Sequence, residues 1–264
     1  MAQLNLLTES DMRDLLTRED VRLSEGRAAE ADQPGMVANP YHQMDMAVVA
    51  RAALAYRYAL QRAPDQLVPL FHESAEHYVR LFECRGVTSK TDSGMAIDPA
   101  IFSADRLYVA VTSAFTLNRQ DLLARLGELP MVAESTLENP GVYAKLAASL
   151  LHYAKGDVDA ARPLIQQAHG FLAVNRSGLP EILSTRLLPV AKAVAAAFWG
   201  RPDAFEQPLE DLLRIHADQA QSGPTSCHPM TLICFDALAL AALAKRAGIA
   251  VHTHSPYMPL QLVG

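Results

Sequence analysis

Apolar residues recur every three or four positions along most of the 264-residue chain, and no segment shows the strict alternation of a half-buried strand. The spacing is clear from Leu67 to Phe82 and again from Ala104 to Phe115. Alanine and leucine supply much of the apolar content, and both favour helix, whereas aromatic residues make up only 6%. The sequence therefore predicts an all-α protein and argues against a sheet-based fold.

Two stretches resemble each other and predict consecutive helical hairpins. In each, a glycine-containing turn separates an alanine-rich helix from a helix with a Pro-Leu pair near its start. Pro163 and Pro208 mark the two pairs and lie 208 − 163 = 45 residues apart. Because this offset is typical of helical-hairpin arrays, we expect antiparallel hairpins packed as a bundle or as an irregular tetratricopeptide-like array. A short extended C-terminal tail follows the last predicted helix.

The N-terminal 35 residues differ from the rest in charge. They contain eight acidic residues and four arginines, a net charge of −4 out of −6 for the whole chain. Ser10 is the predicted N-cap of a helix in this segment, because a hydroxyl there can accept a bond from the first turn. We predict an acidic N-terminal helical segment at 1–35 and a single α-helical domain at 36–264.

The composition disfavours several classes of protein. A net charge of −6 does not suit a nucleic-acid binder, which needs clustered lysine and arginine. Three cysteines (Cys84, Cys227 and Cys234) are too few for a disulfide framework and fit a reducing compartment. The longest apolar run, Met230 to Ala244, is interrupted by Asp236 and is shorter than the roughly 20 residues of a bilayer span. We expect a cytoplasmic protein without a membrane or nucleic-acid partner.

The segment from His72 to His77 contains the residue types of a zinc-protease helix but not their spacing. The HExxH motif needs histidines four apart, and position 76 is Glu. We interpret the i,i+4 pairs His72/Glu76 and Glu73/His77 as an exposed polar helix face.

Other residues with reactive side chains also lack a catalytic pattern. His252 and His254 would lie on the same side of an extended chain, with Cys227 nearby in sequence, but no paired ligand spacing supports a metal site. His216 falls on an apolar helix face and predicts a buried core histidine, and Cys84 predicts a buried thiol. Because the chain has no GxSxG elbow and no glycine-rich phosphate loop, we expect no catalytic residue, metal or cofactor.

A predicted helix from Pro202 to Ala220 carries an acidic stripe. Asp203, Glu206 and Glu210 are spaced i, i+3 and i+7 and would share one face, opposite an apolar face that includes Phe205. Such a stripe is either a solvated face or a docking surface for a basic partner. A docking stripe would mainly speed association and set specificity.

The last third of the chain resembles a known family. Phe198 to Phe205 is similar to that family's G-x-x-x-x-F turn, and Leu209, Leu213 and His216 are similar to its L-x-x-x-L-x-x-H helix. An apolar helix over Leu238 to Ala244 and the segment Gly248 to Val251 come next. The end of the chain, Ser255-Pro256-Tyr257-Met258-Pro259-Leu260-Gln261-Leu262, is similar to the terminal S-x-Y-x-P-x-x-L signature. The family is immunity protein 49 of bacterial polymorphic-toxin systems.

This resemblance implies a mostly helical protein that binds a secreted toxin inside the producing cell, and it supplies no catalytic residues. Many such toxins are nucleases, which suits a cytoplasmic inhibitor that acts by stoichiometric occlusion. The terminal signature is expected to dock the tail onto the last helices. Two hypotheses from other classes stay open: a tetratricopeptide-like scaffold for peptides, and a helical enzyme with unrecognised chemistry. The oligomeric state also stays open.

Overall fold

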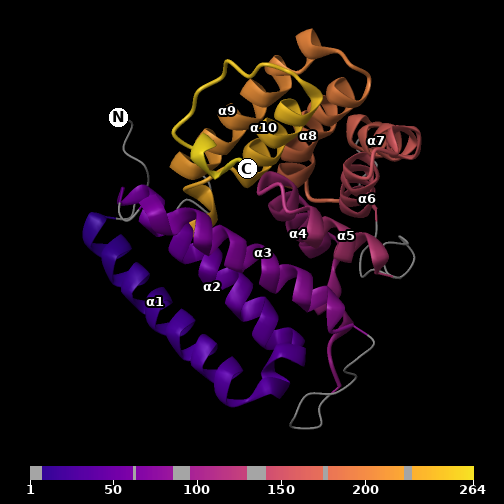
Figure 1. Ribbon diagram of the computed structural model, residues 1–264. Coiled ribbons are helices and arrows are strands. Elements are labelled where there is room, and N and C mark those ends of the chain that lie inside the picture. The colour runs from indigo at the N-terminus through magenta and orange to yellow at the C-terminus, as the bar shows by residue number, and fades with distance from the viewer. Residues whose placement is uncertain (1–7, 62–63, 86–95, 130–140, 175–177, 223–227) are drawn as a thin grey trace.

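The computed structural model describes residues 8–61, 64–85, 96–129, 141–174, 178–222 and 228–264 (Figure 1). Within these ranges the chain forms ten α-helices linked in part by 3-10 turns, and no β-strand. The helices are α1 (Glu9–Asp32), α2 (Pro40–Ala59), α3 (Leu67–Glu83), α4 (Ala104–Thr116), α5 (Gln120–Glu128), α6 (Val142–Ala154), α7 (Val158–Ala173), α8 (Glu181–Phe198), α9 (Glu206–Ser222) and α10 (Phe235–Ala247). The prediction of an all-α fold is confirmed.

Local sequence signals explain where several helices begin. The Asn39 side chain accepts bonds from two amides of the first turn of α2, and Pro40 at the first helical position has no amide that needs a partner. The predicted N-cap Ser10 is wrong, because α1 begins earlier. Thr8 is its N-cap, and Thr8 and Asp11 form a capping box in which each side chain bonds the other's backbone amide.

The two predicted hairpins are α6–α7 and α8–α9, and their turns share one geometry. Gly156 (φ 80°) and Gly200 (φ 62°) both adopt the left-handed conformation that glycine accepts without strain. In each turn the amide of the residue after the glycine donates to the carbonyl five residues earlier. The Asp157 amide donates to His152 and the Arg201 amide to Ala196, both at 2.9 Å. This is the Schellman pattern of helix ends, so the hairpin repeat is confirmed at its turns.

Consecutive helices pack side by side, and α10 then closes the array into a bundle. The three long helices α1, α2 and α3 lie next to one another, and α6 to α9 form the second half of the molecule (Figure 1). The last helix, α10, packs against α4 and α8, which are far apart in sequence. Among the helices described, none combines the length and the apolarity that crossing a bilayer requires.

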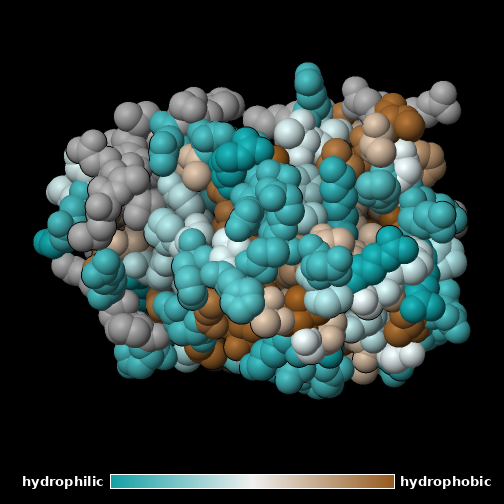
Figure 2. Space-filling model, turned by 90° about the horizontal axis from the view of Figure 1, so that it is seen from above, coloured by the Kyte–Doolittle hydropathy of each residue, from teal (hydrophilic) through white to brown (hydrophobic). Residues whose placement is uncertain are grey.

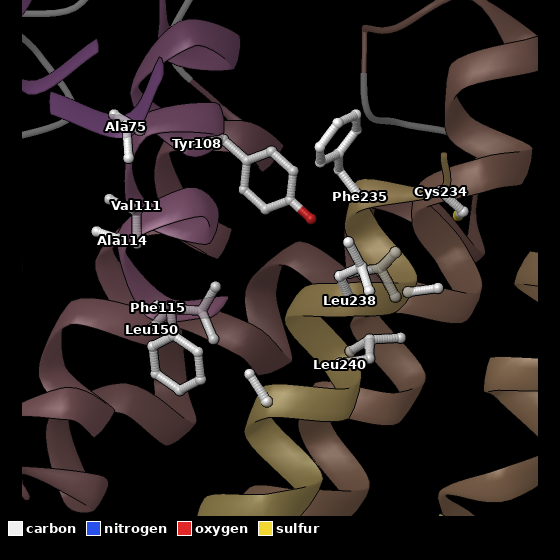
Figure 3. Close-up of a cluster of buried hydrophobic side chains, with 14 of the residues drawn as sticks. Ala75, Tyr108, Val111, Ala114, Phe115, Leu150, Cys234, Phe235, Leu238 and Leu240 are labelled. Carbon is white, nitrogen blue, oxygen red and sulfur yellow. The ribbon is translucent and has the colours of Figure 1, made fainter. Parts of the chain in front are cut away.

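The centre of the core lies where α10 packs against α4, which also packs against α6. Figure 3 shows Phe235, Leu238 and Leu240 of α10 facing Tyr108 and Phe115 of α4 and Leu150 of α6. Every residue from Phe235 to Ala244 is buried. Burial of a leucine or phenylalanine side chain stabilises the fold by about 1.5–3 kcal/mol, so this helix organises much of the core. It begins at Phe235, after Pro229–Thr231 form a separate 3-10 turn.

The acidic helix α1 lies along α2. Leu16 and Leu23 are buried against the core, and ion pairs add contacts at the rim. Asp20 accepts from Arg57 of α2 at 2.6 Å, and Arg27 donates to Glu73 of α3 at 2.5 Å. The division of the chain at residue 35 remains a prediction.

Candidate partner-binding surface

The C-terminal tail after α10 is docked across the bundle. Tyr257, Met258 and Leu262 are buried, and the Tyr257 carbonyl accepts from the Cys234 amide at 2.7 Å. The Tyr58 hydroxyl of α2 donates to the Pro256 carbonyl at 2.5 Å. At the end of the chain, the Gly264 amide donates to the Thr116 carbonyl of α4 at 2.9 Å. The tail is docked as predicted, but it contacts α2 and α4 as well as the start of α10.

His216 connects this tail to α9. Its ring is buried, and Nε2 lies 2.9 Å from the Thr231 carbonyl, which only accepts, so Nε2 carries the proton. The ring meets that of Tyr257 edge-on at 5.1 Å between centroids. Burial, and then the positive charge of Arg186, lower the pKa of His216 to about 4. The prediction of a buried core histidine is confirmed.

The structure separates the three residues of the predicted acidic stripe. The predicted helix from Pro202 is interrupted: Pro202–Ala204 form a 3-10 turn and α9 begins at Glu206. Asp203 is therefore exposed on the turn, while Glu206 and Glu210 are one helical turn apart on α9. Pro208 lies in the first turn of α9, where a proline is tolerated because the amides there have no partner within the helix.

Glu206 and Glu210 differ in what they contact. Glu206 Oε1 accepts from the amides of His252 and Thr253, at 3.1 and 2.6 Å, and from the Thr253 hydroxyl. It thereby holds the extended tail against α9. Glu210 is exposed and lines an open hollow.

This hollow lies where the end of α2, α9 and the tail meet, and its volume is about 570 Å³. Its polar and aromatic lining includes Tyr58, Gln61, Glu210, Arg214, Gln221 and His254. Since Tyr58 also bonds the tail, the shape of the hollow depends on the docked tail. Sequence spacing indicated Glu210 but not Tyr58 or His254, which come from distant parts of the chain.

The polar face predicted on α3 is only partly exposed. Glu76 pairs with Arg80 of the same helix and with Arg125 of α5 at 2.8 Å. The prediction is wrong for His77, which is buried and lies 2.7 Å from the Gln43 side-chain oxygen of α2. The reason is that α2 packs along α3 and covers more than its apolar stripe. In the described ranges no group of three or more metal-ligand side chains is positioned to hold an ion.

The cysteines that the structure describes are buried thiols. Desolvation raises the pKa of Cys84 to about 11 and that of Cys234 to about 12, so both are protonated at neutral pH. The burial predicted for Cys84 is confirmed. Cys227, considered above with His252 and His254, lies outside the described residues.

A partly buried ionic cluster links α10 to α8 and α4. Asp236 Oδ2 accepts two bonds from Arg186 of α8, at 2.6 and 2.9 Å, and Oδ1 accepts from the Tyr108 hydroxyl at 3.0 Å. Figure 3 shows that hydroxyl pointing toward α10. Arg51 of α2 lies over the Phe235 ring at 3.6 Å, and burial lowers its pKa to about 10. Asp236, the one charge in the apolar run, is the sequence feature that could have pointed to this cluster.

The part of the chain that the structure describes is an all-α helical bundle. A family model for immunity protein 49 matches residues 49–262. The chain therefore belongs to the immunity protein 49 family. Immunity proteins are generally non-enzymatic and bind a toxin. Comparison with curated proteins found no match, and neither did comparison with solved structures.

Proposed function

We propose that this chain binds a cognate secreted toxin and neutralises it by covering its active site or substrate groove, without any reaction of its own. Membership of the immunity protein 49 family carries this proposal. In this proposal the toxin is a nuclease that acts in the cytoplasm, and the immunity protein binds it there. Stoichiometric occlusion needs an exposed surface, and α9 with the tail docked beside it offers one.

The contact surface is the outer face of the turn before α9, of α9 itself and of the tail. Asp203 and Glu210 are exposed carboxylates on this surface, and Glu206 keeps the tail in place beside them. Figure 2, which views the end of the molecule where α8 to α10 lie in Figure 1, shows separate apolar patches between hydrophilic side chains. A mixed surface of this kind is typical of non-obligate interfaces.

The charge of this surface fits a nuclease. A nucleic-acid-binding groove is basic because it neutralises phosphates, so carboxylates on an inhibitor can occupy the same sites. Charges at the rim of an interface act mainly on the association rate, and salt screens their effect.

The test uses the toxin encoded beside this gene. Co-expression of the chain should restore growth of cells that produce the toxin, and the purified pair should elute as a stable complex. If the chain neither protects the cells nor forms the complex, the proposed function is wrong.

The contact surface has a separate test. The double variant Asp203→Lys with Glu210→Lys should slow association by about tenfold at low salt, and by less at high salt. The matched control is Asp14→Lys with Glu25→Lys, which changes the charge equally at exposed positions on α1. An unchanged association rate for the first pair would exclude this surface while leaving the function standing.

The tetratricopeptide-like scaffold is less well supported. Such a scaffold binds peptides on an open concave array of hairpins. Here α10 packs onto both α4 and α8 and fills the space that an open array would leave.

A further inference from the structure

A second hollow lies between the two hairpins, away from Glu206 and Glu210. Its volume is about 490 Å³, and its floor consists of Ala195 and Ala196 of α8. Its walls come from α7, from α8, from the turn that follows α8 and from α9. The wall residues are Gln166, His169, Lys192, Trp199, Arg201, Ala204 and Pro208. We call this hollow the α7–α8 groove. It exists because alanines occupy the positions between two large side chains.

The two ends of the groove differ in chemistry. Lys192 and Trp199 are seven residues apart, so they lie on one face of α8 about 10 Å apart along its axis. Trp199 is the single tryptophan of the chain and is 38% exposed. Arg162 of α7 donates to the Phe198 carbonyl and lies 5.9 Å from the Trp199 ring, which fixes the end of α8 beneath that ring. The groove therefore offers a held aromatic surface at one end and an ammonium group at the other.

The two cations that line the groove have no carboxylate partner among the described residues. Most arginines of the described chain pair with an acid, as Arg27 does with Glu73 and Arg125 with Glu83. Lys192 and Arg201 are exposed and make no ion pair with any residue that the structure describes. No carboxylate of the described residues lines the groove. In a chain with net charge −6, this is a local site for negative charge.

We infer that the α7–α8 groove binds an acidic segment of the toxin, with carboxylates on Lys192 and Arg201 and an apolar side chain against Trp199 and the alanine floor. Tryptophan and arginine are enriched among residues that dominate binding energy, and small residues beneath them form the pocket such anchors need. The inference deepens the proposed function, on which the identity of the partner rests, by specifying the chemistry of one partner segment.

The groove lies on the side of α9 opposite Glu206 and Glu210. Pro208 lines the groove, and each of Glu206 and Glu210 is two residues away, which is about 200° around a helix. A basic groove on one side of α9 and the two glutamates on the other favour one orientation of a bound toxin. Complementary charge of both signs fixes register in this way.

Trp199 makes the groove directly measurable, because its fluorescence reports occupancy. The probe is the synthetic peptide acetyl-EELDLEE-amide, titrated into the full chain at low salt. We expect a saturable change in Trp199 emission and at least about tenfold weaker binding of acetyl-QQLNLQQ-amide. The double variant Lys192→Glu with Arg201→Glu keeps the tryptophan and should lose the response. Arg13→Glu with Arg106→Glu makes the same change of charge outside the groove and should keep it.

Several results would overturn the inference. One is the absence of a fluorescence change with the acidic peptide up to about 1 mM, and another is equal binding of that peptide by the groove variant. A third is tighter binding of acetyl-KKLKLKK-amide or of a single-stranded oligonucleotide than of the acidic peptide. The toxin assay separates this failure from failure of the function. If the wild-type chain protects cells and the groove variant protects them equally, the groove proposal alone is wrong. If the wild-type chain does not protect cells, the function is wrong, and the peptide titration still decides the groove.

Discussion

Acidification should destabilise this protein through His216, the histidine of the family's helix motif. Its pKa is about 4 in the folded chain, against about 6.5 in an unfolded chain, because burial and Arg186 disfavour the imidazolium ion. The unfolded state therefore binds this proton at a higher pH than the folded state does. Stability is fully present above about pH 6.5 and is lost as the pH falls toward 4.

The size of the effect follows from the two pKa values. Between about pH 7.5 and about pH 5, the unfolded state gains nearly one proton at this residue and the folded state almost none. The free energy of unfolding should fall by about 2 kcal/mol from His216 alone. The protonated ring would also repel Arg186 and lose its close fit against Tyr257, so the tail should loosen first.

Urea denaturation at the two pH values measures this loss. His216→Gln removes the titrating group and keeps an N–H donor for the Thr231 carbonyl. This variant should lose about 2 kcal/mol less than the wild-type chain on acidification, whatever its stability at neutral pH. The control His252→Gln changes an exposed histidine and should behave as the wild type. Equal losses for the wild type and His216→Gln would refute the argument.

Two further predictions concern the bonds of Asp236 and Glu206. Asp236→Asn leaves Arg186 without its carboxylate and should lower the free energy of unfolding, measured by urea denaturation, by about 3 kcal/mol. Tyr108→Phe removes one hydrogen bond and should lower that free energy about half as much, so equal losses for the two variants would contradict the assigned ion pair. Glu206→Ala removes the acceptor for the tail amides, so hydrogen exchange at Thr253 should speed up by about tenfold while the amides of α10 stay protected. Unchanged exchange at Thr253 would show that Glu206 does not hold the tail.

Local features of the fold were predictable because each depends on residues within a helical turn or two. The spacing of apolar residues located the helices, and the glycines at 156 and 200 marked both hairpin turns. The errors at Ser10 and at Pro202 were also local. Thr8 competes with Ser10 as a cap, and a 3-10 turn replaces the expected first turn of the helix from Pro202.

The candidate surface was predictable only in part. Spacing on one helix identified Glu206 and Glu210, but it could not show that the backbone of the tail would occupy Glu206. The α7–α8 groove left no pattern in the sequence. Its alanines, its unpaired cations and Trp199 are ordinary helix-surface residues until two hairpins bring them together.

The sequence by itself determined that this chain is helical, where its hairpins turn and which family it resembles. Only the tertiary structure decided that His216 meets Tyr257, that Asp236 of α10 accepts a hydrogen bond from Tyr108 of α4, and that the α7–α8 groove lies on the side of α9 away from Glu206 and Glu210. The physical reason is range. Helix formation depends on neighbours a few residues away, whereas these contacts depend on which apolar surfaces pack together.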